Sequence, residues 1–391
     1  MVELFIIADD FTGALDTACQ FGKHGIPTVV FSGRKMPSLP DEIRVAVVNT
    51  DTRHKSPPEA RAIVSELAEV CRIQGFPRIL KKIDSALRGN WGTELEALLW
   101  AGLSDRAYLL PAFPDGGRIT QQGIQWLNGV EIAKTAYGRD PFNPVLSSRL
   151  SDHLSEKWLL ISEGEPLADA PGIQIVDASR SSQLEARCRE LPRHGTLILA
   201  GCAGLAAALA GEMAQGMESC AAPVPPSERL LIVSGSLHPL SRSQTRWAVQ
   251  RGIPLITLSP GSVGAVSDAF RSSRTVILET SGQLDSSREP EYAARQLAQA
   301  VQQIYHKEGP LTLAVFGGDT LLQIVPPIFR EGLYPTDEIS PGIPVSVARD
   351  RTGQPVTLIS KSGGFGPEDV IGQIINYVFS DNLGGNDMDT V

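Results

Sequence analysis

The sequence predicts an α/β protein of two domains, each a mostly parallel sheet flanked by helices. Short β-branched, apolar runs alternate with amphipathic stretches along the chain, and this alternation is typical of doubly wound layers. Most of the runs are apolar throughout, as expected of strands buried on both faces of a parallel sheet. The length of 391 residues, 42% of them hydrophobic and 20% charged, is enough for two domains with cores of their own.

The predicted strands follow one another along the chain. The first five are Glu3–Ala8, Thr28–Ser32, Val45–Asn49, Arg78–Lys82 and Ala107–Pro111. Later strands are Thr196–Ala200, which still precedes the expected domain boundary, and Arg229–Ser234, Leu255–Ser259, Thr275–Thr280, Leu311–Phe316 and Pro355–Ser360. Helices are expected between many of them, for example over Pro58–Gln74 and Pro290–Lys307, where apolar residues recur at helical spacing.

The stretch from Gln215 to Glu228 marks the expected domain boundary, since it holds three prolines and no apolar periodicity. We therefore expect an N-terminal domain over residues 1–215, a linker over 216–228 and a C-terminal domain over 229–380. A mere surface loop is the alternative for the same stretch. Residues 381–391 are expected to form a disordered tail, and Ser147–Ala170, polar and irregular, an excursion from the first sheet.

Composition and charge exclude several kinds of partner and site. A net charge of −9 argues against nucleic acid or an anionic membrane, because both favour a basic patch. The five cysteines are widely spaced without a C-x-x-C pair, so buried thiols are expected rather than a zinc site or disulfides. No basic and apolar leader begins the chain and no apolar run approaches ~20 residues, which predicts a cytoplasmic location.

The six histidines give no sign of a metal centre or of nucleophilic catalysis. None stands at ligand spacing to another histidine or to a cysteine, and the G-x-S-x-G motif is absent. A histidine metal site and a Ser-His-Asp triad are therefore not expected.

Three predicted strands of the second half each end in a turn of small residues before an expected helix. The turns are Ser234-Gly235-Ser236, Gly317-Gly318-Asp319-Thr320 and Lys361-Ser362-Gly363-Gly364-Phe365-Gly366. In a parallel sheet such turns lie at the same carboxyl edge, where ligands bind. Glycine permits close backbone approach, and the unpaired amides at a helix start suit phosphate oxygens. Asp319 could meet a phosphate-bound Mg²⁺, through water.

One such turn alone is more often a feature of tight packing, but three in one domain favour a nucleotide site. The Walker A motif is absent, which excludes a P-loop NTPase. A strand-linked GxGxxG with a following ribose-binding acid is also absent, which argues against a Rossmann dehydrogenase.

The first half places acids and bases directly after predicted strands. They are Asp9 and Asp10 after the first strand, Arg53 after the third, and Lys82, Asp84 and Arg88 at the end of the fourth. Adjacent carboxylates are costly to bury unless they bind something, so the three aspartates are candidates to bind hydroxyls, with Asp10 and Asp84 as catalytic bases. The three cations are candidates to bind a substrate carboxylate. Helix capping by Asp10 and surface ion pairs by the bases are the alternatives.

These observations favour a small polyhydroxy acid on the first domain and a nucleotide on the second. Phosphoryl transfer needs positioning and charge neutralisation more than covalent chemistry. Closure of one domain on the other would supply both.

Seven motifs, in order, resemble the four-carbon acid sugar kinase family. They are IADDFTGALDTA, KKIDSALRGN, PAFPDGGR, AGCAGLAAAL, SGSLHPLSRSQ, FGGDT and KSGGFG. The resemblance runs from Leu4 to about Phe379. Ala86, Cys202 and His238 depart from it, since they stand where the family often has a threonine, a serine and a small hydroxyl residue.

The resemblance implies a transferase of carbohydrate metabolism that phosphorylates a tetronate-type acid with ATP. D-threonate, at its 4-hydroxyl, is the first candidate, and D-erythronate and 3-oxo-tetronate are the alternatives. It implies acid binding by Asp9, Asp10, Lys82, Asp84 and Arg88, and ATP binding by Ser234, Ser236, Gly317, Gly318, Asp319, Thr320, Gly363 and Gly364.

Two interpretations from other classes stay open. One is an NAD(P)-dependent sugar-acid dehydrogenase, and the other is a non-catalytic sugar-acid sensor, which would need no anion site of three turns. The expected partners are therefore a small sugar acid and ATP, and a homodimer is left open.

Overall fold

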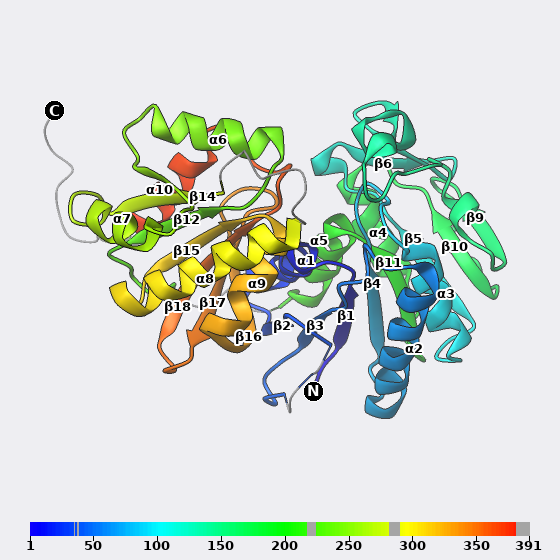
Figure 1. Cartoon of the computed structure of the whole chain (residues 1–391). Helices are drawn as coiled ribbons and strands as arrows, with labels where there is room; N and C mark the ends of the chain where they lie inside the picture. Colours follow the sequence, from blue (N-terminus) through cyan, green and yellow to red (C-terminus); the bar gives the residue numbers. More distant parts are fainter. Residues whose placement is uncertain (35, 37–38, 217–223, 281–289, 381–391) are drawn as a thin grey trace, which may run out of the picture. The chain divides into compact units, whose positions relative to one another are not determined.

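The computed structural model of the chain describes residues 1–34, 36, 39–216, 224–280 and 290–380 (Figure 1). It divides into two compact units, Met1–Ala221 and Ala222–Val391. The predicted tail over 381–391 lies outside the described residues, as do residues 217–223 of the predicted linker.

The first unit is built on a parallel sheet with the strand order β2-β3-β1-β4-β11-β5-β10-β9. Its central strands are fully buried, which explains their unbroken apolar sequence. The strands are β1 (Leu4–Ala8), β2 (Thr28–Phe31), β3 (Val45–Asn49), β4 (Arg78–Lys82), β5 (Arg106–Leu110), β9 (Trp158–Ile161), β10 (Gly172–Val176) and β11 (Leu197–Gly201).

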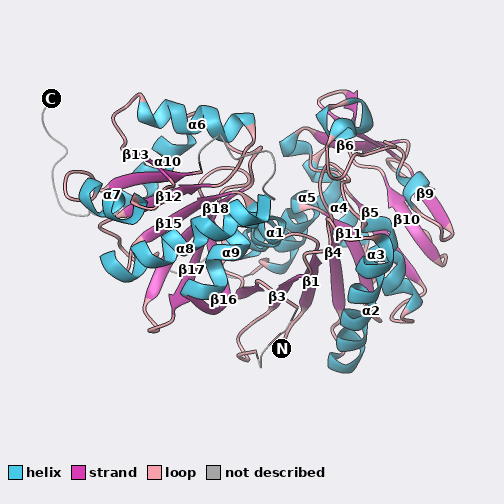
Figure 2. Ribbon diagram, viewed as in Figure 1, coloured by secondary structure: helices cyan, strands magenta, loops and turns pink. Residues whose placement is uncertain are grey.

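Two groups of helices cover the two faces of this sheet (Figure 2). Helix α1 (Phe11–Gly22) packs on α5 (Ala203–Met213), which also packs on α4 (Ser181–Glu190). Helix α2 (Pro57–Gln74) packs on α3 (Trp91–Trp100). The chain runs toward β2 after β1 but toward β4 after β3, and right-handed crossovers in opposite directions place their helices on opposite faces.

Helix α2 shows how the local sequence sets the ends of an element. Pro57 occupies its first turn, where no backbone donor is needed. The Glu59 carboxylate accepts from the Ser56 amide at 3.0 Å, which satisfies a donor at the helix start. Gly75 ends the helix with a φ of +67°, a left-handed conformation that glycine adopts without steric cost.

The second unit has the strand order β13-β14-β12-β15-β18-β17-β16. The first five strands in this order, β13, β14, β12, β15 and β18, pair in parallel. Strand β17 pairs with both its neighbours, β18 and β16, in the antiparallel sense. The strands are β12 (Leu230–Ser234), β13 (Leu255–Thr257), β14 (Thr275–Glu279), β15 (Thr312–Phe316), β16 (Phe329–Glu338), β17 (Pro344–Asp350) and β18 (Pro355–Lys361).

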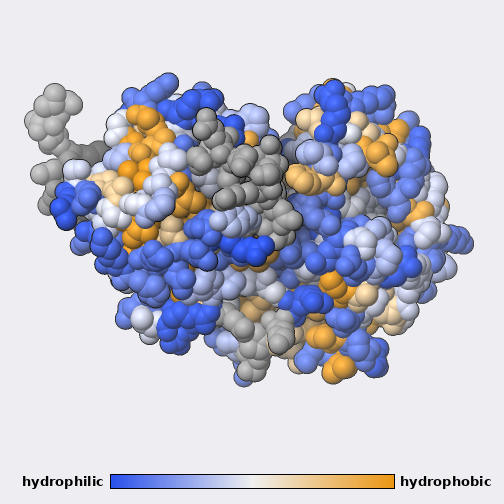
Figure 3. Space-filling model, viewed as in Figure 1, coloured by the Kyte–Doolittle hydropathy of each residue, from blue (hydrophilic) through white to orange (hydrophobic). Residues whose placement is uncertain are grey.

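Helices again cover both faces of the second sheet. Helix α8 (Pro290–Glu308) packs on α7 (Ser262–Ala269) and on α9 (Gly318–Ile328), and α10 (Val370–Ser380) packs on α6 (Pro239–Val249). Buried side chains of β12, β15 and α10, such as Ile232, Phe316 and Ile374, form the core on one face. Apolar side chains also gather on the visible surface of this unit near α6 and β13 (Figure 3).

The predicted fold class is confirmed, because both units are mostly parallel sheets flanked by helices. Strands β9, β10, β16 and β17 were not predicted from the sequence, and neither was a small antiparallel sheet of β6 (Arg118–Gln121), β7 (Ile124–Leu127) and β8 (Val130–Glu131). Strand β16 was hidden by its irregular pattern, since it contains Gly332 and Pro335 and shifts register twice against β17. Among the described helices, none is long and apolar enough to cross a membrane.

Candidate functional site

Three neighbouring strands of the first unit end at the same level and carry the predicted acids and bases. Ala8 at the end of β1 lies beside Asn49 of β3 and Lys82 of β4. The chain continues from these three positions into Asp9 and Asp10, into the 50–53 loop, and into Asp84. Parallel pairing therefore brings together groups that are more than forty residues apart in the sequence.

Arg53 is the centre of this cluster. Its Nε and Nη2 donate to the two carboxylate oxygens of Asp9 at 2.8 and 3.0 Å, and Nη2 also donates to Asp10 Oδ1 at 2.6 Å. Asp84 Oδ1 lies 3.9 Å from the same nitrogen. Charge-assisted bonds of this kind fix geometry as well as charge, so Arg53 holds Asp9 and Asp10 at one edge and lies within ion-pair distance of Asp84.

Arg88 forms a second fork on the same edge. Its Nε and Nη2 donate to the two oxygens of Asp84 at 2.8 and 3.1 Å, and Nη1 lies 3.3 Å from Asp140 Oδ2. The guanidinium also lies over the ring of Tyr137, 5.2 Å from its centroid. Neither residue was predicted from the sequence. Tyr137 lies in the short helix η3 (Ala136–Arg139) and Asp140 follows it, in a segment without apolar periodicity.

Lys82 and Gly13 complete the cluster beside Asp10. Lys82 is 4% exposed, and its Nζ donates to the carbonyl of Ile83 at 2.9 Å. A Cβ at Gly13 would lie 2.3 Å from Asp10 Oδ1 and 2.9 Å from Lys82 Nζ. Only a glycine therefore leaves room for the carboxylate and the ammonium against helix α1.

The charges around the aspartates keep them ionised. Burial alone would raise the pKa of Asp10, but the charges of Arg53 and Lys82 outweigh it, so the pKa lies below its ordinary value. Burial also opposes ionisation of Asp84, and the charges of Arg88 and Arg53 prevail to lower its pKa. Both carboxylates are therefore charged at neutral pH.

Asp10 is the most accessible of the three carboxylates. Its side chain is 21% exposed, compared with 2% for Asp9 and 11% for Asp84. Asp10 stands at the N-cap position of α1, yet its side chain makes no capping hydrogen bond. It accepts from the Thr12 hydroxyl at 2.7 Å and from Arg53 instead, so helix capping does not account for this carboxylate.

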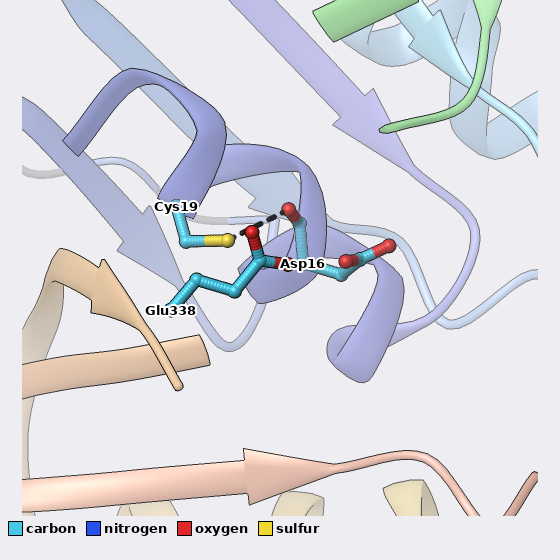
Figure 4. Close-up of side chains that lie close together, drawn as sticks. All are labelled: Asp16, Cys19 and Glu338. Carbon is cyan, nitrogen blue, oxygen red and sulfur yellow. Dashed lines mark hydrogen bonds between the residues drawn. The ribbon is translucent and has the colours of Figure 1, made fainter. Parts of the chain in front are cut away.

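Helix α1 also carries Cys19, whose thiol makes a hydrogen bond. Cys19 Sγ donates to the backbone carbonyl of Asp16 at 3.0 Å (Figure 4). Glu338, drawn in the same figure, belongs to the second unit. The four described cysteines are buried, and none is in a disulfide within the described residues. Burial raises the pKa of Cys71 and Cys188 to about 12 and that of Cys202 to about 11, so these three thiols are poor nucleophiles.

In the second unit, the three glycine turns meet at one edge. They follow β12, β15 and β18, which are adjacent in the sheet. A Cβ at Gly235 would lie 1.9 Å from Thr320 Oγ1, and one at Gly317 would lie 3.3 Å from the Ser236 amide. Gly317 also has a φ of +116°, which favours glycine. The first two turns are thus in direct contact.

The third turn closes against the first. A Cβ at Gly363 would lie 2.5 Å from Ser236 Oγ, whereas one at Gly364 would lie no closer than 3.5 Å to His238. Gly363 is therefore the more constrained of these two glycines. His238 is the N-cap of α6, where its Nδ1 accepts from the Leu240 amide at 3.2 Å, so this departure from the family motif has a local structural role.

A pocket of about 350 Å³ opens beside the first turn. Ser234 and Ser236 line it together with the apolar side chains of Leu237, Val249 and Leu255. Glu279, at the end of β14, lines it too. The pocket joins an apolar wall to the polar turn, a combination typical of small-molecule sites.

Two family models match the chain. A family model described as "Sugar-binding N-terminal domain" matches residues 4–209, and one described as "Nucleotide-binding C-terminal domain" matches residues 231–371. A D-threonate kinase of Bordetella bronchiseptica is 28% identical over 396 residues, which cover 94% of this chain and 95% of that protein. A 3-oxo-tetronate kinase of Salmonella typhimurium is 26% identical over 415 residues, which cover 94% and 97%.

A solved structure shows the same fold. The crystal structure of a Salmonella typhimurium protein described as a tRNA synthase superposes with a TM-score of 0.81 at 24% sequence identity. The match covers 96% of this chain and 99% of that chain. At this identity the likeness concerns the fold alone.

Proposed function

Because the chain belongs to the four-carbon acid sugar kinase family, we propose that it transfers the γ-phosphate of ATP to the 4-hydroxyl of D-threonate. D-erythronate and 3-oxo-tetronate are the alternative acids. The observation that carries the proposal is the meeting of three glycine turns in the second unit, which suits a triphosphate. The carboxylate and ammonium cluster of the first unit suits a polyhydroxy acid.

Asp10 is the proposed catalytic carboxylate. Both oxygens of Asp84 are held by Arg88, and both oxygens of Asp9 are held by Arg53. Asp10 keeps the largest exposed fraction, 21% of its side chain. Its lowered pKa makes it a weak base, which suits a loose phosphoryl-transfer transition state in which the carboxylate mainly orients the hydroxyl and takes its proton late.

Lys82 is the proposed contact for the substrate carboxylate. Arg53 and Arg88 already form two-point contacts with protein aspartates, so their main role in the proposal is to hold Asp9, Asp10 and Asp84. Lys82 Nζ donates to a backbone carbonyl. An ammonium with three donors retains capacity for a substrate oxygen.

The nucleotide is proposed to lie on the second unit. The phosphates would face the turns at Ser234 and Ser236, at Gly317–Thr320 and at Gly363 and Gly364, and the adenosine would enter the pocket beside Val249 and Leu255. Asp319 is exposed in the first turn of α9, and a carboxylate there suits a phosphate-bound Mg²⁺. That ion would neutralise phosphate charge.

A coupled assay tests the function. We expect ADP release when the protein is given ATP, Mg²⁺ and one of D-threonate, D-erythronate or 3-oxo-tetronate, and no release without an acid. A sensor would bind an acid without releasing ADP, and a dehydrogenase would reduce NAD(P) instead. If none of the acids leads to ADP release, and ATP does not raise the unfolding temperature, the kinase proposal fails.

The homodimer stays a prediction, which size-exclusion chromatography tests. The cytoplasmic location also stays a prediction.

Replacing Gly13 by alanine should raise KM for the acid and lower kcat, so that kcat/KM falls by about 10- to 100-fold. The reason is that one added methyl group displaces two charged groups by about an ångström. The new Cβ would overlap Asp10 Oδ1 and Lys82 Nζ. KM for ATP should stay unchanged. Gly211→Ala is the matched control, since Gly211 is also in a helix of the first unit and a Cβ added there would meet no neighbouring atom within 4 Å. Equal kinetics for both variants would contradict the crowding argument.

A further inference from the structure

Lys361 is a fully buried cation at the end of β18, directly before the third glycine turn. Its Nζ donates to the Ser241 hydroxyl at 3.0 Å and to the carbonyl of Ser362 at 3.1 Å. It also reaches the carbonyls of Gly363 and Phe365 at 3.3 and 3.4 Å. The ammonium therefore gathers three carbonyls of one turn around a single point.

No acidic side chain compensates this charge within the described residues. The hydrogen-bond partners of the ammonium there are neutral oxygens, and a further neighbour is the ring of Phe316, 4.7 Å from Nζ. Burial lowers the pKa of Lys361 to about 7. A buried cation without a counter-ion is costly for the fold, so its presence calls for a reason besides stability.

The contacts of Lys361 extend beyond the third turn. Ser241 lies on α6, which follows the first turn, and its hydroxyl also donates to the Gly363 carbonyl at 3.0 Å. The second turn is joined through the Phe316 ring and through the Gly317 amide, which donates to the Lys361 carbonyl at 2.9 Å. The third turn is held by its own carbonyls. Through its side chain and its own backbone carbonyl, Lys361 thus connects the third turn with the second turn and with the helix that follows the first.

A second buried side chain acts in the same direction. Gln244 Nε2, on α6, donates to the carbonyls of Phe365, Gly366 and Pro367 at 3.1, 3.2 and 2.8 Å. With Lys361 it draws successive carbonyls of the turn toward the interior. Backbone amides and carbonyls point in different directions. The Phe365 amide donates to the Ser362 carbonyl at 3.2 Å, so the carbonyls collected inside leave the amides of Ser362, Gly363 and Gly364 available outside.

We propose that Lys361 is a positioning residue for the nucleotide, whose ammonium holds the 362–365 turn so that its amides and those of the neighbouring turns face the phosphates of ATP. The proposal rests on the proposed kinase function and deepens it. Lys361 does not touch the substrate. It sets the orientation of the donors, and a phosphate bound in front of them would favour the protonated ammonium.

Lys361→Met tests this, because methionine keeps much of the apolar stem and removes the ammonium. We expect the Kd for ADP, measured by calorimetry, and the KM for ATP to rise about 10- to 100-fold, the usual effect of losing hydrogen bonds to a charged group. The KM for the acid should not change, and this split separates positioning from a general loss of folding. Lys307→Met, at an exposed position of the same unit, should leave Kd unchanged.

The outcomes separate this inference from the proposed function. If the wild-type protein binds no ADP, the kinase proposal fails and this one fails with it. If the wild type binds ADP and a folded Lys361→Met binds it equally well, only the positioning role is overturned. Should Lys361→Met not fold, Ser241→Ala decides, since it removes one acceptor of the ammonium with little change in volume: weaker ADP binding with unchanged KM for the acid supports the role, and an unchanged Kd overturns it.

Discussion

Asp10→Asn is expected to lower kcat by about 10²- to 10⁴-fold, the range typical for loss of a positioned proton acceptor. Asparagine keeps the shape of the side chain and can still accept from Thr12, which donates to Asp10 at 2.7 Å. It cannot carry the charge that faces Arg53 and Lys82. The affinity for ATP should not change, since the nucleotide is assigned to the other unit, and calorimetry with ADP checks this.

Two other variants serve as controls for the loss of a carboxylate. Glu66→Gln removes a carboxylate from an exposed ion pair with Arg34, which contributes little to stability, and should leave kcat as it is. Asp84→Asn should weaken folding more than Asp10→Asn does, because Arg88 would lose its two-point partner. An Asp10→Asn enzyme with wild-type kcat would reduce Asp10 to a structural residue and move the catalytic role to another carboxylate.

The pH profile adds a check on the same residue. The pKa of Asp10 lies below its ordinary value of 3.8, so Asp10 is ionised throughout the neutral range. Its ion pairs contribute stability that is present above pH 3.8 and is lost as the pH falls through the lower, folded-state pKa. Wild-type kcat should therefore show no acid limb between about pH 5 and 7 that can be assigned to this group, and a limb there would point to another base.

Much of the candidate site could be predicted from the sequence, because its residues follow the ends of predicted parallel strands. Apolar runs precede each of three groups of charged residues, namely Asp9 and Asp10, Arg53, and Lys82 with Asp84. Because parallel strands end at one edge of a sheet, the proximity of these groups follows from the sequence pattern. The partners within the cluster do not follow. Arg53 donates to Asp9 and Asp10 and is therefore not available to bind a substrate carboxylate. This pairing depends on side-chain geometry.

Other features carried no signal in the sequence. Tyr137 and Asp140 reach Arg88 from a short 3₁₀ segment, and segments without periodicity give no register from which to place a side chain. In the sequence Lys361 is one polar residue of a glycine-rich turn, yet its side chain is fully buried. Local pattern gives the strands and their ends, whereas the direction of a long side chain at a strand end is decided by tertiary packing.

Gly235→Ala is expected to raise the KM for ATP and the Kd for ADP by about 5- to 150-fold, which corresponds to the usual cost of overpacking. The added Cβ would lie 1.9 Å from Thr320 Oγ1 and 2.9 Å from its Cβ. Thr320 is 3% exposed and lies in the first turn of α9, so either the helix start or the end of β12 must shift. Both movements displace the amides proposed to face the phosphates.

Thr320 provides the internal test of that mechanism. In a Thr320→Ala background the clashing hydroxyl is absent, so Gly235→Ala should cost less there than in the wild type, a coupling that a double-mutant cycle measures. Gly264→Ala is the matched control, because a Cβ added at Gly264, on α7 of the same unit, would meet no neighbouring atom within 4 Å. Additive effects in the cycle would mean that Gly235 acts through something other than contact between the first two turns, and the three-turn phosphate site would lose its main geometric support.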